Sequence, residues 1–354
     1  MRVLWFNLAT DLDDPILAFT TSWIREVATT VDSIHVITMR LGRTELPENV
    51  RIYSVGKEKR FSEPRRAWEF YRHIFRILHQ ESIDVCFSHM IPIFTILGYL
   101  PLKLHGVPII TWYAHRQRSF ILRVAHHVSD RMASTNTRSY PYSGNKLCVL
   151  GQGIDTELFK PNATITPADP PLILFVGRLS PIKDPLTFIR AAYLLRSKHR
   201  FRVAVIGQIL ERDREYARIV LQEIAQLRKT VPVEFIPGIG QNQLVSWYQR
   251  CFALMNCSPS DHSLDKTVLE AMACGKLALT STVGFEETIG RESSVLLFRS
   301  GDPEDLAEKL ANLLKLPTRT IQAMSSHLRE QTVQNHSLRN LAGNLTALLH
   351  KLNE

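Results

Sequence analysis

The stretch FALMNCSPSDHSLDKTVLEAMACGKLALTST (252–282) decides the fold class of this chain. FALMNC is an apolar run typical of a buried strand, and the polar loop SPSDHSLD follows it. KTVLEAMACG has the pattern of a helix that Gly275 ends, and LALTS (277–281) is the pattern of the next strand. Buried strands that alternate with helices indicate a parallel sheet covered on both faces.

The same alternation extends along the rest of the chain. In the first half we expect strands at 3–7, 34–38, 50–55, 85–89, 108–113 and 146–151, and helices at 15–30, 64–80, 91–104 and 119–129. In the second half we expect strands at 172–176, 202–207, 233–237, 252–257, 277–281 and 295–298, and helices at 184–198, 211–229, 241–249, 266–274 and 303–315. The last segment, 317–352, has a helical pattern.

We therefore predict an α/β protein of two doubly wound parallel-sheet, Rossmann-like domains that face an interdomain cleft. The first domain is expected at 1–160, a proline-rich linker at 161–171 and the second domain at 172–330. A C-terminal helix over 331–354 either stays with the second domain or crosses back to the first. Ligands of such domains bind at the carboxyl ends of the strands, so the site is expected there.

Composition narrows the function classes. The chain has 354 residues, of which 45% are hydrophobic, and this length and composition fit two globular domains. Its net charge of +9 fits a polyanionic partner. The basic excess is spread over both halves and no nucleic-acid-binding motif is present, so we expect no nucleic-acid partner. Five cysteines without CxxC spacing, and an N-terminus unlike a signal peptide, lead us to expect a cytoplasmic protein.

Two motifs suit a diphosphate. The N-terminus of the helix that begins KTVLE has positive dipole character, and Glu270 lies one turn in, within reach of a ribose hydroxyl next to that phosphate. GRLSPIKD (177–184) ends another strand and carries Arg178 and Lys183, which could neutralise a departing diphosphate without a metal. Each motif also has an ordinary interpretation: an amphipathic helix with a solvated Glu, and two solvated turn cations.

Together these motifs resemble the retaining, GT-B-fold glycosyltransferases of family 4, also called glycosyl transferases group 1. The resemblance covers nearly all of 108–315, and the matching pieces are VGRLSPIKDPLTFIRAA (176–192), the strand that ends at Gly207, LVSWYQRCFALMNCSPS (244–260), DKTVLEAMACGKLALTST (265–282) and GDPEDLAEKLANLL (301–314). GQGIDTELFKP (151–161) is similar to the segment just before the family's hinge. The resemblance implies an acceptor domain first and a nucleotide-sugar domain second.

The resemblance also assigns donor-binding residues. It implies that Arg178 and Lys183, with Gly177, hold the donor diphosphate, and that Glu270 contacts the nucleotide ribose. Thr267 and Val268 match the backbone that cradles phosphate.

The chain departs from the family at the first acid of the Glu–seven residues–Glu motif, where His262 stands. That acid normally contacts the donor sugar, so we predict that position 262 sets donor choice. The neighbouring Asp261 and Asp265 could partly substitute for it, and His262 could also be an ordinary loop histidine.

In the first half, His115 follows the strand at 108–113, where the family often places an active-site histidine. The alternative is a capping or surface histidine beside Arg116 and Arg118. Asp11, Asp13 and Asp14 follow the first strand where the family often has a glycine-rich loop. We interpret them as acids at a helix N-terminus, with a share in acceptor binding or a metal site as alternatives, and we expect no metal.

The segment 57–80 is basic and interleaved with Trp68, Phe70, Tyr71 and Phe75. Such a helix can lie on an anionic membrane as a peripheral contact, or be an ordinary domain helix with its aromatic side chains in the core. The latter is slightly favoured, because a doubly wound domain needs that helix.

We therefore predict a hexosyltransferase-type glycosyltransferase without a cofactor, which moves a sugar from a nucleotide-diphosphate-sugar to an acceptor hydroxyl with retention. A glycan or lipid-linked acceptor, in surface polysaccharide, lipopolysaccharide or glycolipid synthesis, fits best. The alternatives are another GT-B enzyme, such as a nucleotide-sugar epimerase or a phosphorylase, and a non-catalytic nucleotide-sugar-binding protein.

Overall fold

The strands form two separate sheets in which every named pair of neighbours is parallel, as predicted. The computed structural model describes residues 1–14, 17–142, 144–259 and 264–353. The chain divides into two compact units: the first contains Met1–Gly153 and Leu338–Glu354, and the second contains Ile154–Ser337.

The first unit is built on a seven-stranded sheet with the order β3-β2-β1-β4-β5-β6-β7. Its strands are β1 (Arg2–Asn7), β2 (Ser33–Thr38), β3 (Val50–Ser54), β4 (Val85–His89), β5 (Ile109–Trp112), β6 (Arg131–Ser134) and β7 (Leu147–Val149). Its helices are α1 (Ala18–Ala28), α2 (Glu63–Gln80), α3 (Pro92–Leu104), α4 (Phe120–Val128) and α13 (Leu338–Asn353).

The two faces of this sheet bury different helices. One face packs against α1 and α13, with Trp5, Val36 and Leu345 in the same apolar cluster. The other face packs against α2 and α3, through side chains that include Phe6 and Phe70. A sheet covered on both faces explains why central strands such as β1 and β4 are buried along almost their whole length.

The second unit has a five-stranded sheet with the order β10-β9-β8-β11-β12. Its strands are β8 (Leu172–Val176), β9 (Arg202–Gly207), β10 (Val233–Pro237), β11 (Ala253–Asn256) and β12 (Leu277–Thr280). Its α-helices are α5 (Pro185–Leu195), α6 (Arg214–Leu227), α7 (Gln241–Arg250), α8 (Lys266–Ala273), α9 (Glu286–Ile289), α10 (Ser293–Leu296), α11 (Pro303–Leu314) and α12 (Thr318–His336). Short 3-10 turns are η1 (Glu211–Asp213), η2 (Val283–Phe285) and η3 (Gly290–Glu292).

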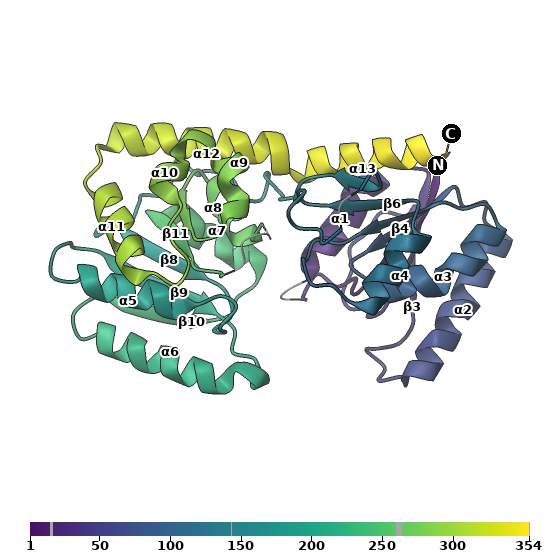
Figure 1. Cartoon of the computed structure of the whole chain (residues 1–354), viewed down its shortest axis with the longest axis horizontal. Helices are drawn as coiled ribbons and strands as arrows, with labels where there is room; N and C mark the ends of the chain where they lie inside the picture. The colour runs from purple at the N-terminus through teal and green to yellow at the C-terminus, as the bar shows by residue number, and fades with distance from the viewer. Residues whose placement is uncertain (15–16, 143, 260–263, 354) are drawn as a thin grey trace. The chain divides into compact units, whose positions relative to one another are not determined.

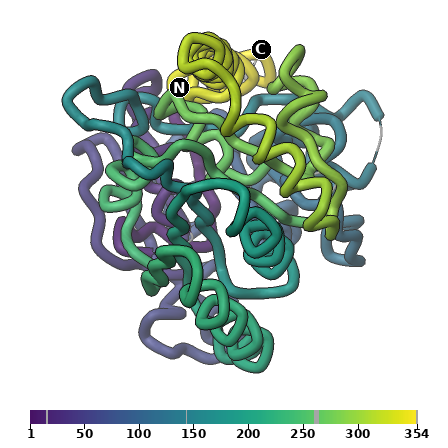
Figure 2. Tube along the Cα trace, turned by 90° about the vertical axis from the view of Figure 1, so that its left-hand side faces the viewer, coloured from purple at the N-terminus to yellow at the C-terminus, as the bar shows by residue number. Residues whose placement is uncertain are grey.

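The helices of the second unit form two groups around one core. Helix α5 packs against α6 and α11, and α8 packs against α7 and α12. Figures 1 and 2 place α12 along one side of this unit and α6 along the opposite side.

Several sequence-based boundaries need correction. The run at 295–298 is not a strand: it is the end of α10, followed by an isolated bridge from Leu297 to Thr280. Such a run is too short for its period to separate strand from helix. Strand β6 was missed, and 211–229 begins with the turn η1 before α6.

The units also divide at positions other than those predicted. The second unit begins at Ile154 rather than at 172, because Phe159 is already buried in its core. The return to the first unit comes after Ser337 rather than at 331. Helix α13 then packs onto the first unit. Of the two alternatives for the C-terminal helix, it is therefore the crossing back to the first domain that the structure shows.

Candidate functional site in the second unit

The predicted donor-binding residues gather where the strand order of the second sheet reverses. Strand β8 lies between β9 and β11, and Phe175 is level with Met255, so Val176 and Asn256 end side by side. This reversal is the place where doubly wound domains bind ligands. The loop that carries Arg178 and Lys183 follows β8 directly.

Lys183 and Asp265 form the central contact of this site. The ammonium of Lys183 donates to Oδ1 of Asp265, the residue that precedes the first turn of α8. Oδ2 of Asp265 accepts hydrogen bonds from Asn256 Nδ2 and Ser258 Oγ, each at 2.7 Å. Thr280 in turn donates to Oδ1 of Asn256 at 2.8 Å, so the strand ends of β11 and β12 anchor the network.

The protonation of Asp265 follows from these contacts. Burial by itself would raise the pKa of its carboxyl, but the Lys183 charge and the hydrogen bonds from Lys183, Ser258 and Asn256 outweigh burial and lower that pKa. Asp265 is therefore an anion whose two oxygens are both occupied. That arrangement leaves it better placed to hold Lys183 than to contact a sugar.

Arg178 is the second cation of the loop. Its side chain is half-buried and makes no ion pair or hydrogen bond with any residue in the described part of the chain. The loop lies so close to β9 that a Cβ at Gly207 would collide with the carbonyl oxygen of Gly177. Asp184 ends the loop as the N-cap of α5, accepting from the Thr187 amide at 3.3 Å, with Pro185 at the first helical position.

Helix α8 presents the remaining donor residues. The amide of Val268 already donates to the carbonyl of Asp265 at 3.2 Å, while Thr267 lies half-buried in the same first turn. Glu270 is 5% exposed, and its carboxylate accepts from the Tyr248 hydroxyl at 2.9 Å and from Gln241 Nε2 at 3.4 Å.

Burial dominates the electrostatics around Glu270. It raises the pKa of the Glu270 carboxyl, against the Tyr248 hydrogen bond and the nearby charge of Lys266. Burial likewise lowers the pKa of the Lys266 ammonium. Both hydrogen-bond partners of Glu270, Tyr248 and Gln241, belong to α7, so α7 orients this carboxylate. Local sequence patterns do not indicate this link.

Two predicted positions, Asp261 and His262, lie outside the described residues. His115, in contrast, is described: it is exposed in the loop after β5 and makes an edge contact with the ring of Tyr113, with 5.9 Å between ring centroids. It therefore lies at the carboxyl edge of the first sheet, as expected of a ligand-binding position in that unit.

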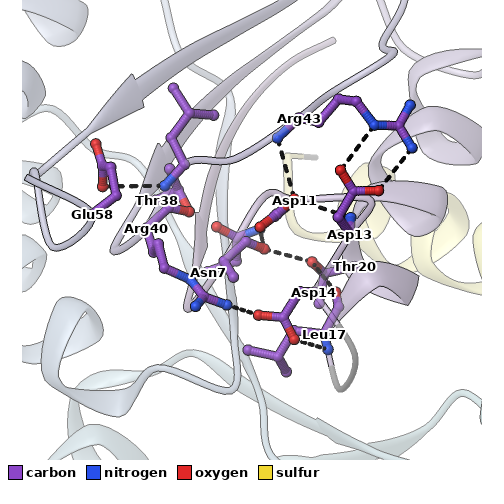
Figure 3. Close-up of polar contacts among 12 residues, drawn as sticks. Asn7, Asp11, Asp13, Asp14, Leu17, Thr20, Thr38, Arg40, Arg43 and Glu58 are labelled. Atoms are coloured by element: carbon purple, nitrogen blue, oxygen red, sulfur yellow. Dashed lines mark hydrogen bonds and ion pairs between the residues drawn. The ribbon is translucent and has the colours of Figure 1, made fainter. Parts of the chain in front are cut away.

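The acids that follow β1 are held by partners within the chain (Figure 3). Asp13 forms a two-pronged pair with Arg43, at 3.0 and 2.9 Å, and Asp14 pairs with Arg40. Asp11 Oδ1 accepts from the amides of Asp13 and Arg43, at 3.0 and 3.2 Å. These contacts are those of a structured loop, and within the described ranges no group of three or more acid, His or Cys side chains is arranged to hold a metal.

Helix α2 combines both interpretations of the segment 57–80. Phe70 is fully buried, as a domain helix requires, but Trp68 and Phe75 are 61% and 52% exposed. They are seven residues apart and therefore share one helix face, with Arg72 beside the Trp68 ring. No helix among the described residues is long and apolar enough to cross a membrane.

Sequence reasoning missed the residues that support the predicted ones. Asn256 and Ser258 fix Asp265, and Tyr248 and Gln241 fix Glu270. The one usable signal was Asn256, a polar residue at the end of an otherwise apolar strand. Tyr248 carries no such signal, because an aromatic residue on an amphipathic helix normally belongs to the core.

Comparison with known proteins agrees with this geometry. Residues 170–316 match the family described as Glycosyl transferases group 1. A D-inositol 3-phosphate glycosyltransferase from Frankia alni is 32% identical over 191 residues, which is 50% of this chain and 47% of that protein. A second from Catenulispora acidiphila is 28% identical over 54% of this chain and 48% of its own. The chain thus spans about half the length of the curated relatives it matches.

Solved structures match over nearly the whole chain. Sucrose-phosphate synthase from Thermosynechococcus elongatus has a TM-score of 0.80 at 16% identity, covering 99% of each chain. Anabaena HepE in complex with UDP has a TM-score of 0.78 at 14% identity, covering 99% of this chain and 100% of that one. Identities this low establish the fold alone. Residues 170–316 are therefore similar to the glycosyl transferases group 1 family, and the chain has the two-domain GT-B fold.

Proposed function

We propose that this protein is a glycosyltransferase that moves a sugar from a nucleoside-diphosphate sugar to an acceptor hydroxyl, with retention of the anomeric configuration. The observation that carries the proposal is the pair of cations after β8, Arg178 and Lys183, at the strand reversal of a glycosyl transferases group 1 domain. Arg178 is half-buried without a partner in the described residues, which is the state of a cation awaiting an anionic ligand.

Leaving-group stabilisation is the chemistry that these residues offer. When the bond between sugar and diphosphate breaks, negative charge grows on the departing phosphate oxygens. A guanidinium and an ammonium held at that point stabilise the developing charge more than the ground state, which lowers the barrier. We propose that this makes the reaction independent of a divalent metal.

The donor half of the proposal takes support from relatives. Among the structural neighbours, Anabaena HepE has been crystallised with UDP, with UDP and glucose, and with UDP-glucose. We propose a nucleoside-diphosphate hexose as the donor here. We also retain His262 as the proposed determinant of the donor sugar, with Glu270 at the ribose.

We propose a glycan or lipid-linked acceptor, in synthesis of a surface polysaccharide, lipopolysaccharide or glycolipid. The curated relatives described above are named as D-inositol 3-phosphate glycosyltransferases, so the acceptor proposed here differs from the one in their names. The support in this chain is the exposed Trp68 and Phe75 on basic α2, which suit a peripheral contact with an anionic membrane.

A ligand screen tests the proposal directly. Thermal unfolding should be measured with nucleoside diphosphates and their sugars, because a ligand at a hundred times its dissociation constant stabilises the fold by about 2.7 kcal/mol. Product analysis of the stabilising donor, with and without an acceptor, then separates transfer from epimerisation and phosphorolysis. Stabilisation without turnover would indicate a binding protein, and no stabilisation by any nucleotide would contradict the proposal.

A further inference from the structure

Two cavities of the first unit meet at α4 and the loop after β6. The larger has a volume of about 760 Å³, runs along α4 and is lined in part by Arg118, Arg123 and Tyr142. The smaller has a volume of about 600 Å³ and is lined in part by Arg116, Arg118, Arg138 and Tyr142. Because Arg118, Pro141 and Tyr142 line both cavities, they form the wall that the two share.

The shared wall holds its guanidinium in place. Arg118 donates to the carbonyl oxygen of Pro141 at 3.2 Å, and its guanidinium carbon is 5.8 Å from the centroid of the Tyr142 ring. A guanidinium carries five N–H donors, so one bond to a carbonyl leaves donors for an anion on either side.

The lining of both cavities is rich in arginine. Among the residues that the structure describes, no Asp or Glu lines either cavity, and the sequence has no Asp or Glu from Val85 to Ser129. Arg123 and Arg138 form no ion pair with any residue that the structure describes. Grouping like charges costs free energy, so a cluster of arginines with no acid is explained best by an anionic ligand.

Aromatic rings accompany the arginines. Phe120, at the start of α4, is 80% exposed and lines the larger cavity beside Tyr142. Tyr140 lines the smaller one, and its hydroxyl is 2.9 Å from Nδ1 of His126. An inorganic ion needs no aromatic surface, whereas a phosphate carried by a sugar ring or a lipid does.

We propose that these cavities bind the phosphate of the acceptor substrate, as a phosphomonoester or a diphosphate, with Arg118 between them as the principal ligand. The proposal rests on the proposed transferase function and names its acceptor class. The cavities belong to the first unit, whereas the cations of the donor loop belong to the second, and Arg116 directly follows His115 in the loop at the end of β5. Phosphate bound there would hold an acceptor in the unit that the family resemblance assigns to the acceptor.

The first experiment measures anion binding with the donor loop disabled. In the full-length double variant Arg178→Ala, Lys183→Ala, calorimetry should still detect inorganic pyrophosphate. Adding Arg118→Ala or Arg138→Ala should weaken that binding about ten- to a hundredfold, since each removes a charged hydrogen-bonding partner.

The matched control is Arg196→Ala in the same background. Arg196 also donates to a backbone carbonyl, that of Tyr193, and its guanidinium carbon lies 3.7 Å from the centroid of the Tyr193 ring, but it belongs to the second unit. This variant should bind pyrophosphate as its parent does. Equal losses in the Arg118 and Arg196 variants, or no pyrophosphate binding in the parent, would overturn the proposal.

The second experiment identifies the source of the phosphate. Co-sedimentation of the otherwise unmodified protein with phosphatidic acid vesicles, but not with phosphatidylcholine vesicles, should fall in Arg118→Ala if a lipid carries the phosphate. If Arg118→Ala weakens pyrophosphate binding but leaves vesicle binding unchanged, the site is assigned to a soluble acceptor. If nucleoside diphosphates fail to bind the unmodified protein while pyrophosphate binding still depends on Arg118, the transferase proposal fails and this anion site stands.

Discussion

The ammonium of Lys183 is paired with the carboxylate of Asp265, which lies 82 residues further along the chain. Lys183 is in the loop that follows β8, and Asp265 is in the segment that follows its neighbour β11. A diphosphate that binds at this loop must share Lys183 with Asp265 or take it over. The pair therefore links the proposed leaving-group cation to α8 and to Asn256, and it gives each partner a separate experimental signature.

Replacing Lys183 should weaken binding and slow turnover together. Lys183→Ala removes a charge that would stabilise the departing diphosphate, which costs about 3 kcal/mol in the transition state, or about a hundredfold in rate. Steady-state kinetics and calorimetry with nucleoside diphosphate would measure both effects. Unchanged affinity and rate would exclude Lys183 from the site.

Replacing Asp265 should separate these two quantities. Asp265→Asn removes the negative charge beside Lys183, so nucleoside diphosphate should bind at least as tightly as before. The freed ammonium is less well placed, so kcat should fall by about tenfold. A loss of affinity in this variant would instead mean that Asp265 contacts the ligand itself.

Chelation should leave transfer intact. Activity in excess EDTA should equal activity without it, because the proposed leaving group is neutralised by side chains and Asp13 and Asp14 are paired with Arg43 and Arg40. Loss of turnover that Mn²⁺ or Mg²⁺ restores would return the acids after β1 to consideration as a metal site.

Stability should fall in mild acid because of His336. Burial lowers the pKa of this histidine from 6.5 to about 4, while Nε2 lies 2.8 Å from the Thr288 hydroxyl oxygen. As the pH falls, His336 takes up its proton in the unfolded chain before it does so in the folded chain. The free energy of unfolding is therefore unaffected by His336 above pH 6.5 and falls by about 3 kcal/mol between pH 6.5 and pH 4. Denaturant unfolding of His336→Gln should show a flatter pH profile over this window.

The exposed face of α2 should bind anionic vesicles. Trp68→Ala with Phe75→Ala should reduce co-sedimentation, and added salt should release the unmodified protein. The control is Tyr193→Ala, which removes an aromatic ring of 44% exposure from the second unit. Equal binding by both variants would leave α2 as a helix of the domain and nothing more.

Local patterns predicted the bounds of a strand well where polar or turn residues flank it. The bounds of β4, β8, β9 and β10 match the expected ranges, because each is a run between clear polar or turn residues. Strand β6 escaped notice since RMAS combines a charged and a polar residue with two apolar ones. The strand predicted at 295–298 was wrong for the opposite reason: the run is apolar, but it is too short to show whether its period is that of a strand or of a helix.

The site was predictable only in its individual residues. Arg178, Lys183 and Glu270 follow from strand ends and helix starts, which local sequence marks. Their partners do not, because the contacts of Lys183 with Asp265 and of Tyr248 with Glu270 span 82 and 22 residues. Such pairs are set by how neighbouring strands and helices pack, and a single sequence carries no register between them.

Helix α13 reverses the order in which the two units become complete during synthesis. Leu341, Leu345 and Leu349 complete the core against Trp5, yet they are translated after every residue of the second unit. The ribosome therefore delivers the whole of the second unit while one face of the first sheet still lacks a helix. Although the first unit starts emerging first, the second unit is the earlier of the two to have its full set of residues for folding.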